Sequence, residues 1–269
     1  MRKRRTQRAE QRTTLVAPVV AVARSVFSVL FPSGCRLCGL PLVNISRLPV
    51  CEVCLDSLEP IRAWQCLQCG LRLAPAQLLI GDGRCHGCHE FKPDFDRAVC
   101  CGEYAGTVRG LIHLLKYDNV MPASRVLGEL LAQAIQQLDT KDEHAPLLVP
   151  VPKRCERGFN QAELIARAAL RNLPQRFEIA AVLKRRRPTH SQVGLTREER
   201  IANWRDAFRV TDPVKGRTVI VIDDVMTTGS MVSECARVLK RLEPLEFAQP
   251  RCRPTAGCRV RTRGGRRSS

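Results

Sequence analysis

Residues 219–232 read VIVIDDVMTTGSMV. The β-branched run Arg217–Ile222 predicts a short buried strand, because such runs are typical of the central strands of parallel sheets. Two adjacent acids, Asp223 and Asp224, end this strand, and apolar residues at helical spacing from Ser230 onward predict a helix. In an open α/β sheet, ligands bind beyond the carboxyl ends of the strands. We therefore expect both acids to lie at a binding edge.

The segment Thr227–Ser230 has the composition of an anion-binding turn. Its backbone N–H groups at a helix start, together with its hydroxyl groups, suit a phosphate and should face the same space as the acids. The sequence contains neither G-x-x-x-x-G-K-[ST] nor G-x-G-x-x-G, so neither a mononucleotide P-loop nor a dinucleotide fold is indicated. A sugar phosphate matches this set: the turn would hold the phosphate, while Asp223 and Asp224 would accept hydrogen bonds from vicinal hydroxyls.

The remainder of the C-terminal two thirds alternates between helical and strand patterns. A short strand is predicted over Leu147–Val151, and Asn160 and the sequence Thr196-x-x-Glu199 are typical helix caps. Apolar periodicity predicts helices over Thr107–Tyr117, Ser124–Leu138, Gln161–Leu170, Thr196–Asn203 and Ser230–Leu239. This alternation predicts an α/β fold with a mostly parallel sheet flanked by helices.

Eight of the fourteen cysteines form four C-x-x-C pairs, with twelve residues between the first two pairs and fifteen between the last two. Two residues between thiolates let a tight knuckle present both sulfurs to one tetrahedral ion, and a second knuckle completes the shell. Gly39 and Gly70 follow two of the knuckles and suit the positive φ of such turns. The spacing predicts two structural Zn²⁺ sites in a small zinc-ribbon module, held by Cys35, Cys38, Cys51 and Cys54 and by Cys66, Cys69, Cys85 and Cys88.

Other interpretations of the cysteines are open but fit less well. Disulfides would suit a secreted chain, whereas C-x-x-C pairs suit a metal ion better. Residues 85–89 also match the haem-attachment pattern C-x-x-C-H, but haem there would leave Cys66 and Cys69 without partners. A redox C-x-x-C requires a βαβ context that this Gly- and Pro-rich stretch lacks.

The N-terminal region is apolar between residues 14 and 31, but Arg24 and Pro18 interrupt it, so a membrane-spanning helix is not expected. A signal peptide with Ala21-Val22-Ala23 as its small-x-small site is the alternative to a short amphipathic helix over Val26–Phe31, which we prefer. We expect a cytoplasmic protein, or one peripheral to the inner membrane.

The formal charge of +18 is concentrated at the ends of the chain. Residues 1–12 hold six basic residues and one acid, and residues 247–269 hold seven arginines and no acid. Such ends either bind an anionic polymer through its phosphates or remain as solvated, disordered segments.

The stretch 219–230, with its aliphatic strand, Asp-Asp and Thr-Thr-Gly, resembles the phosphoribosyl pyrophosphate signature of the type I phosphoribosyltransferases. The resemblance implies that Asp223 and Asp224 are the catalytic pair and hold the ribose 2- and 3-hydroxyls. It implies that Mg²⁺ accompanies the pyrophosphate and that four residues wrap the 5-phosphate, Thr227, Thr228, Gly229 and Ser230. Fixed carboxylates would also stabilise the positive charge that develops on the ribose as pyrophosphate leaves.

Further stretches resemble one subfamily, the ComF (competence protein F) family. They are Leu30-Phe-Pro before the first knuckle, Lys116-Tyr117, Pro150-Val-Pro followed by Arg157-Gly-Phe-Asn-Gln, and Gln192–Arg197 with Arg200, Asn203 and Phe208. This resemblance covers roughly residues 26–240. It implies that the segment after Pro152 is the pyrophosphate loop, with contacts from Lys153, Arg154 and Arg157. It further implies that residues 186–208 form a hood that closes over the ligand, with Arg197 and Arg200 aimed inward.

These patterns together predict four regions. They are a basic and apolar N-terminal extension (1–25), a double zinc ribbon (26–97), a phosphoribosyltransferase-like domain (98–243) and a basic, disordered or aberrant tail (244–269). The tail contains Pro244, Pro250 and Pro254 and has no strand pattern, whereas the family ends in a strand after its last helix.

Two functions follow from the sequence. The first is Mg²⁺-dependent transfer of a phosphoribosyl group from phosphoribosyl pyrophosphate, or a related sugar phosphate, to a nitrogen nucleophile. The second is a non-catalytic adaptor that binds single-stranded DNA through its zinc ribbons and basic ends, in agreement with the family's association with the competence machinery and DNA uptake. Met231 stands where the family usually has Thr or Ser, and with the altered tail it weakens catalysis but not binding. The sequence leaves catalysis open.

Overall fold

The computed structural model describes residues 33–42, 46–58, 65–73, 82–138, 144–153, 158–174, 176–189, 194–214, 216–241, 247–248 and 261–262. The chain forms two compact units, Met1–Leu58 and Glu59–Ser269. The first two cysteine pairs belong to the first unit, and the last two share the second unit with the α/β region. The predicted helix Val26–Phe31 lies outside the described residues.

The first unit is small and is organised around its cysteines. A turn over residues 36–38 is closed by a bridge between Gly34 and Pro41, and helix α2 (Glu52–Asp56) follows. Gly39 has a φ of 79°, as the knuckle pattern predicts. Its buried apolar residues among those described are Cys35, Leu48 and Val50. So small a core contributes little burial energy to the stability of this unit.

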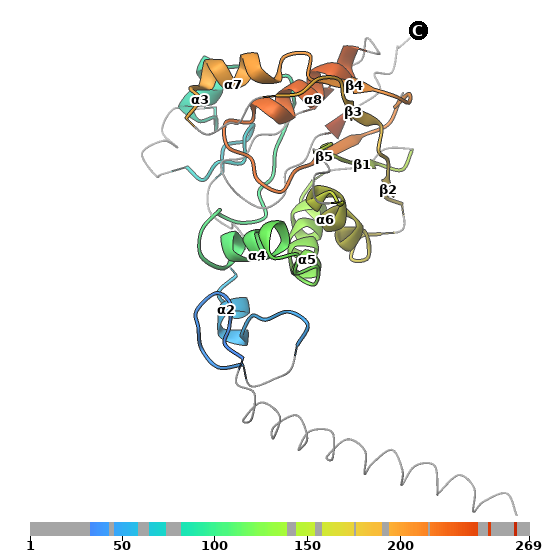
Figure 1. Ribbon diagram of the computed structural model, residues 1–269. Helices are drawn as coiled ribbons and strands as arrows, with labels where there is room; N and C mark the ends of the chain where they lie inside the picture. The colour runs from blue at the N-terminus through green and yellow to red at the C-terminus, as the bar shows by residue number, and fades with distance from the viewer. Residues whose placement is uncertain are drawn as a thin grey trace, which may run out of the picture. The chain divides into compact units, whose positions relative to one another are not determined.

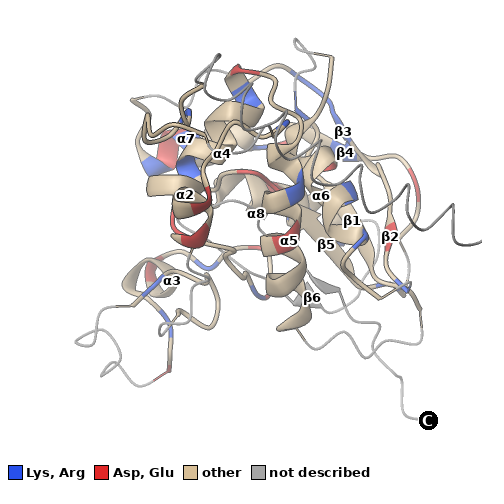
Figure 2. Ribbon diagram, turned by 90° about the horizontal axis from the view of Figure 1, so that it is seen from below, with Lys and Arg blue, Asp and Glu red and all other residues tan. Residues whose placement is uncertain are grey.

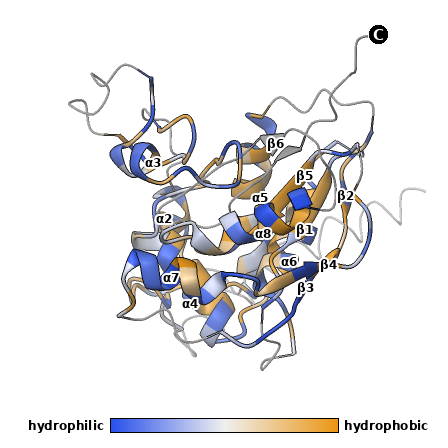
Figure 3. Cartoon of the chain, turned by 90° about the horizontal axis from the view of Figure 1, so that it is seen from above, coloured by the Kyte–Doolittle hydropathy of each residue, from blue (hydrophilic) through white to orange (hydrophobic). Residues whose placement is uncertain are grey.

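The second unit contains a parallel sheet with the strand order β2-β1-β5 (Figure 1). Its strands are β1 (Leu147–Pro150), β2 (Glu178–Ile179) and β5 (Val219–Ile222), and Leu147 pairs with Val219 while Pro150 pairs with Ile222. Every residue of β1 and β5 is buried, and both strands are coloured as hydrophobic in Figure 3. Burial on both faces explains why these strands are unbroken aliphatic runs instead of alternating patterns.

Helices cover both faces of this sheet, as the sequence predicts. Helices α4 (Gly106–Tyr117), α5 (Ala123–Gln136) and α6 (Gln161–Leu170) lie on one side, and α8 (Ser230–Arg241) lies on the other (Figure 1). Both predicted caps are present. Asn160 accepts a hydrogen bond from the Ala162 amide at 3.0 Å, and Thr196 forms a capping box with Glu199 at the start of α7 (Arg197–Trp204). The α/β prediction is therefore confirmed. None of the described helices is long and apolar enough to cross a bilayer.

The sequence does not predict five of the short strands, namely β2 of the parallel sheet and the four strands of two antiparallel pairs. Strands β3 (Leu183–Arg185) and β4 (Phe208–Val210) pair antiparallel on either side of α7 in the chain. Strands β6 (Phe247–Ala248) and β7 (Arg261–Thr262) also pair antiparallel, so the tail contains two short strands although its sequence has no strand pattern. Segments of two or three residues are too short to show the apolar–polar alternation that identifies a strand in sequence, and their pairing depends on residues far away in the chain.

The second cysteine region has its own small buried cluster and continues into a segment that packs in the core of the α/β region. It contains a bridge between Gln65 and Arg72 and helix α3 (His86–Glu90). Just after α3, Phe95 is 1% exposed and packs in the same buried cluster as residues of β1, β5 and α8. The Ala98 amide also donates to the carbonyl of Gln68 at 3.0 Å. The zinc-ribbon pattern and the sheet thus form one packed unit.

Candidate functional site

The two predicted acids lie at the carboxyl end of β5, where the chain leaves two neighbouring strands toward opposite faces of the sheet. Strand β1 leads into α6 on one face of the sheet, and β5 leads into α8 on the opposite face (Figure 1). Such a switch point leaves room for a ligand beyond the strand ends. The hydrogen-bond ladder between β1 and β5 continues one residue past the end of β1, because the Val151 amide donates to the Ile222 carbonyl at 2.9 Å. This register brings Lys153, two residues further on, beside Asp223 and Asp224.

Two lysines neutralise the two carboxylates. Lys153 Nζ lies 3.2 Å from Asp223 Oδ1 and forms a closer ion pair with Asp224 Oδ1. Lys116 Nζ, from the last turn of α4, lies 2.9 Å from Asp224 Oδ2. Each aspartate is 1% exposed, and both lysine side chains are half-buried, so two buried carboxylates are paired with two partly exposed ammonium groups. The family resemblance predicts Lys153 as a pyrophosphate contact, whereas the sequence assigns no role to Lys116, which belongs to the Lys116-Tyr117 stretch.

The adjacent acids have opposite electrostatic environments. Burial raises the pKa of Asp223 to about 6, opposed by Lys153 and reinforced by the charge of Asp224. Burial also acts to raise the pKa of Asp224, but Lys153 and Lys116 outweigh it and hold that pKa at about 2. Burial disfavours the charged form of Lys153, yet both carboxylates raise its pKa above the ordinary value. Asp224 is therefore ionised at neutral pH, whereas the pKa of Asp223, at about 6, lies close to neutral pH.

One carboxylate oxygen in this cluster is left over. Asp223 Oδ1 accepts from the Asp224 amide at 2.9 Å and faces Lys153, whereas buried Asp223 Oδ2 has no hydrogen-bond partner among the described residues. A buried polar atom without a partner is costly and points to a donor that is supplied from outside the chain. Hydroxyl groups of a bound sugar are donors of the required kind.

The turn after the acids presents unused donors at the start of α8. Gly229 has a φ of 75°, and the amides of Thr227, Thr228 and Gly229 donate to no group that the structure describes. The hydroxyls of Thr228 and Ser230 lie 2.6 Å apart. Three free amides, a hydroxyl pair and the positive end of a twelve-residue helix suit a phosphate group.

A cavity of about 400 Å³ opens beside this turn. Its lining includes Thr228, Gly229 and Ser230, with Phe91 and Asp94 from the second cysteine region and Arg197, Ile201 and Arg205 from α7 and its end. Asp223 and Asp224 do not line it. The structure thus brings the predicted residues together around the turn, with the acids paired to two lysines and with Thr228, Gly229 and Ser230 lining the cavity.

The predicted arginines differ in their placement. Arg197 lines the cavity, donates from Nη2 to the Gly87 carbonyl at 3.2 Å, and lies 4.3 Å from the centre of the Phe91 ring. Arg200 Nε is buried without a hydrogen-bond partner in the described part of the chain, and Arg200 is absent from the cavity lining. Arg157 and Arg154 lie outside the described residues.

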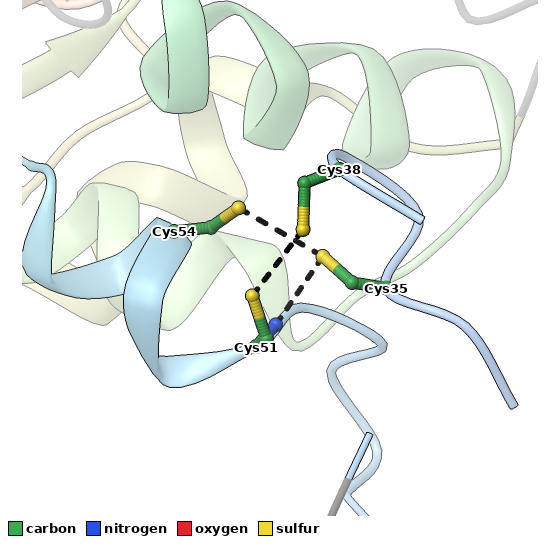
Figure 4. A group of neighbouring side chains, drawn as sticks. All are labelled: Cys35, Cys38, Cys51 and Cys54. Atoms are coloured by element: carbon green, nitrogen blue, oxygen red, sulfur yellow. Dashed lines mark hydrogen bonds between the residues drawn. The ribbon is translucent and has the colours of Figure 1, made fainter. Parts of the chain in front are cut away.

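The first cysteine cluster has the geometry of a four-thiolate metal site (Figure 4). Its sulfurs point toward a common centre, with Cys35 and Cys54 3.9 Å apart and Cys38 and Cys51 3.5 Å apart. Four thiolates at the usual zinc–sulfur distance in a tetrahedron are about 3.8 Å apart. The Cys51 amide also donates to Cys35 Sγ at 3.3 Å, an interaction that orients the ligand.

The second cluster repeats this arrangement in buried surroundings. Cys66 and Cys88 are 3.6 Å apart, Cys69 and Cys85 are 3.4 Å apart, and all four residues are buried. Amides of Cys69 and Cys85 donate to Cys66 Sγ at 3.3 and 3.2 Å. Each cluster could therefore hold one zinc ion in a complete shell of four protein ligands, which is typical of a structural site.

Comparison with known proteins agrees with these features. Residues 114–248 match the family described as "Phosphoribosyl transferase domain". The chain is 33% identical over 216 residues to the DNA utilization protein YhgH of Escherichia coli K12, covering 78% of this chain and 92% of that protein. It is 28% identical over 213 residues to competence protein F of Haemophilus influenzae, covering 74% and 88% of the two chains. The chain therefore belongs to the phosphoribosyl transferase domain family, in the branch that contains competence protein F and the YhgH proteins.

Proposed function

We propose that the protein binds Mg²⁺-phosphoribosyl pyrophosphate at the carboxyl end of β5. The 5-phosphate would lie on the turn Thr227–Ser230, and Asp223 and Asp224 would accept from the ribose hydroxyls. The observation that carries this proposal is that, within the described ranges, buried Asp223 Oδ2 has no hydrogen-bond partner and lies beside a helix start whose first amides donate to no group. An acceptor atom for a hydroxyl and donors for a phosphate lie next to each other in the sequence and at one sheet edge.

Ligand binding would require the lysines to change partners. Without ligand, Lys153 and Lys116 occupy three of the four oxygens of Asp223 and Asp224. A pyrophosphate group offers these ammonium groups several anionic oxygens, and their departure would release the carboxylates for the sugar diol. Bound Mg²⁺ would supply further positive charge to the pyrophosphate, and the same two carboxylates fit its preference for oxygen ligands and retained water.

The same arrangement suits transfer of the phosphoribosyl group. As pyrophosphate leaves, positive charge develops on the ribose, and fixed carboxylates beneath it would stabilise that charge. Thr227 provides no carboxylate that could take a proton from an acceptor, so we propose a basic amine as the nucleophile in preference to a purine base. Measured pyrophosphate release across candidate amines checks this, and release with purines alone would contradict it.

We further propose that each cysteine cluster holds one structural zinc ion and that the protein acts in the handling of DNA. The sulfur–sulfur separations support the first statement. The names of the relatives, DNA utilization protein and competence protein F, support the second. Metal analysis of the purified protein should give two zinc ions per chain.

Calorimetric titration with Mg²⁺-phosphoribosyl pyrophosphate tests the main proposal. The wild-type protein should bind, and Asp223→Asn should reduce affinity by about tenfold or more, since a charged acceptor is lost from a buried site. Glu163→Gln, on the exposed side of α6, is the matched control and should bind as the wild type does. Equal affinities for wild type and Asp223→Asn would contradict the assignment.

The pH dependence of binding gives a second reading. Because burial raises the pKa of Asp223 to about 6, its carboxylate is progressively protonated as the pH falls through that value. The protonated group can no longer accept hydrogen bonds from both ribose hydroxyls. Affinity should therefore decrease below about pH 6 more steeply in the wild type than in Asp223→Asn. Protonation of the ligand's own phosphates affects the affinity of both proteins alike, so the difference between the two pH profiles reports Asp223.

A second candidate function, binding of single-stranded DNA without catalysis, is favoured by a basic run. Lys184 to Arg187 lie in and directly after β3, and Figure 2 shows this stretch coloured as basic. Lys184 and Arg186 are exposed, so they are accessible to phosphates. Binding of an oligonucleotide should weaken steeply as salt rises, and less steeply in Lys184→Ala/Arg186→Ala. An affinity that does not change between low and moderate salt would contradict this candidate.

A further inference from the structure

The cavity beside the phosphate turn has one wall that comes from the second cysteine cluster. Arg197, the first residue of α7, reaches this wall through two contacts. Its Nη2 donates to the carbonyl of Gly87 at 3.2 Å, and its guanidinium lies 4.3 Å from the centre of the Phe91 ring. Both Arg197 and Phe91 line the cavity, together with Thr228 to Ser230. The cluster therefore bears directly on the position of a cationic side chain beside the turn.

The contact at Gly87 is inside the metal-ligating segment. Gly87 lies between Cys85 and Cys88, and a Cβ at this position would be only 3.1 Å from Arg197 Nη1. Helix α3 is only five residues long, with Cys85 as its N-cap residue and Cys88 within it, so it is too short to be stable by itself. Its conformation, and with it the direction of the Gly87 carbonyl, depends on the cysteine cluster being closed.

A second connection joins the same region to the helix that follows the turn. The Asp94 amide donates to Ser233 Oγ at 2.9 Å, and Ser233 Oγ donates to Asp94 Oδ2 at 3.0 Å. The Ser233 amide in turn donates to the Gly229 carbonyl at 2.8 Å, within the turn. Two independent contacts therefore lead from the cysteine region to the proposed phosphate site, one through α7 and one through α8.

We propose that the second metal site sets the ligand affinity of the phosphate turn, and that Arg197 is the residue through which it acts. With metal bound, α3 would hold Arg197 in the cavity, where its charge favours an anionic ligand on Thr228 to Ser230. Without metal, α3 loses its shape, and both Arg197 and the first turn of α8 lose their supports. The first metal site, in the other compact unit, would have no such effect. The affinity part of this proposal rests on the proposed function above.

Hydrogen exchange tests the coupling without any ligand. Full-length Cys85→Ser/Cys88→Ser should lose one metal ion and exchange faster at the amides of 197–204 and 229–233 than the wild type. The matched variant Cys51→Ser/Cys54→Ser should also lose one metal ion but keep wild-type exchange in both segments. Unchanged exchange at 197–204 in Cys85→Ser/Cys88→Ser, after loss of its metal ion, would overturn the proposal.

Gly87→Ala and Arg197→Ala test the affinity part with the metal site intact. Each should lower the affinity for Mg²⁺-phosphoribosyl pyrophosphate by about tenfold, within the usual range of coupling between two sites. Arg167→Ala, which removes an exposed arginine of α6, should have no effect. Because Gly87 acts through Arg197, Gly87→Ala/Arg197→Ala should lose no more affinity than Arg197→Ala alone, whereas additive losses would contradict this route.

The two proposals fail in different ways. If the wild-type protein does not bind the sugar phosphate, the proposed function is wrong, and the coupling is decided by hydrogen exchange alone. If the wild type binds and Gly87→Ala binds equally well with its metal content unchanged, the ligand site stands and the control by the second metal site is wrong. Faster exchange at 197–204 in Cys85→Ser/Cys88→Ser, together with weaker binding of the sugar phosphate by Gly87→Ala, supports both proposals.

Discussion

The two cysteine clusters share one ligand pattern but occupy different surroundings. In the first cluster Cys38 is exposed and Cys51 and Cys54 are half-buried, whereas all four cysteines of the second cluster are buried. The first belongs to a unit that ends at Leu58, and the second belongs to the unit that contains the sheet. The spacing of C-x-x-C pairs fixes how a metal is held, but it does not fix what the metal supports.

The difference in surroundings implies a difference in role. A metal in the first cluster would stabilise a small unit with few buried apolar residues among those described. A metal in the second cluster would stabilise a segment that packs in the main core through Phe95 and contacts Arg197 of α7 through Gly87. We therefore expect metal loss to remain local in the first unit and to spread through the α/β region in the second.

The largest effect should come from removal of either proposed metal site, since a structural zinc ion would contribute on the order of 10 kcal/mol of binding free energy. Trp204 is buried and stacks on Phe208 with ring centres 5.5 Å apart, so its fluorescence reports the second unit. With Trp64→Phe as background, Trp204 is the sole tryptophan. Cys85→Ser/Cys88→Ser should shift the Trp204 unfolding transition to much lower denaturant, and Cys51→Ser/Cys54→Ser should leave it unchanged. Equal shifts would remove the distinction between the clusters.

The next effect should come from Phe95→Ala, which separates the second cluster from the core without touching a metal ligand. Phe95 is 1% exposed, and removal of a buried phenylalanine side chain costs about 3–5 kcal/mol. The Trp204 transition should fall by this amount in urea unfolding. Val50→Ala, at a residue that is 6% exposed in the first unit, is the control and should not move that transition. A loss below about 1 kcal/mol for Phe95→Ala would show that the shared core is not important.

Much of the fold was predictable because its signals are local. The aliphatic runs of β1 and β5, the Asn160 cap and the Thr196 capping box each depend on neighbours in sequence, and all are present. The same is true of both cysteine sets, whose spacing follows from the coordination of one ion. Sequence patterns of this kind specify strands, helix ends and cysteine knuckles, but not the parts of the protein against which these pack.

The rest depends on contacts between distant residues. Lys116 reaches Asp224 only because α4 packs beside the sheet, and a lysine at a helix end carries no signal for such a partner. The contact between Gly87 and Arg197 spans 110 residues and becomes visible only in the folded chain. The burial that separates the pKa values of Asp223 and Asp224 is likewise a property of packing, since the two acids are equivalent in the sequence.

A smaller effect should follow from Ser233→Ala, which removes both hydrogen bonds between Asp94 and α8. These bonds lie at an exposed position, so the loss should be about 1 kcal/mol, reduced by a few tenths because alanine is the better helix former. The same variant should accelerate hydrogen exchange around residues 94–96 and leave the first unit unaffected. Unchanged exchange there would mean that the connection through α8 does not hold the second cluster in place.

The smallest effect should come from the surface ion pair that also links the second cysteine region to the α/β region. Arg72 Nη1 lies 3.1 Å from Glu103 Oε1, and the two side chains are 62% and 54% exposed. Solvent screens such a pair, so Glu103→Ala should change the free energy of unfolding by less than about 0.5 kcal/mol in the Trp204 assay. The contrast with Phe95→Ala then measures what joins the second cluster to the sheet, because apolar burial predicts a large ratio between the two losses. A loss for Glu103→Ala comparable to that for Phe95→Ala would instead assign the connection to charge, and raising the salt concentration should then weaken it.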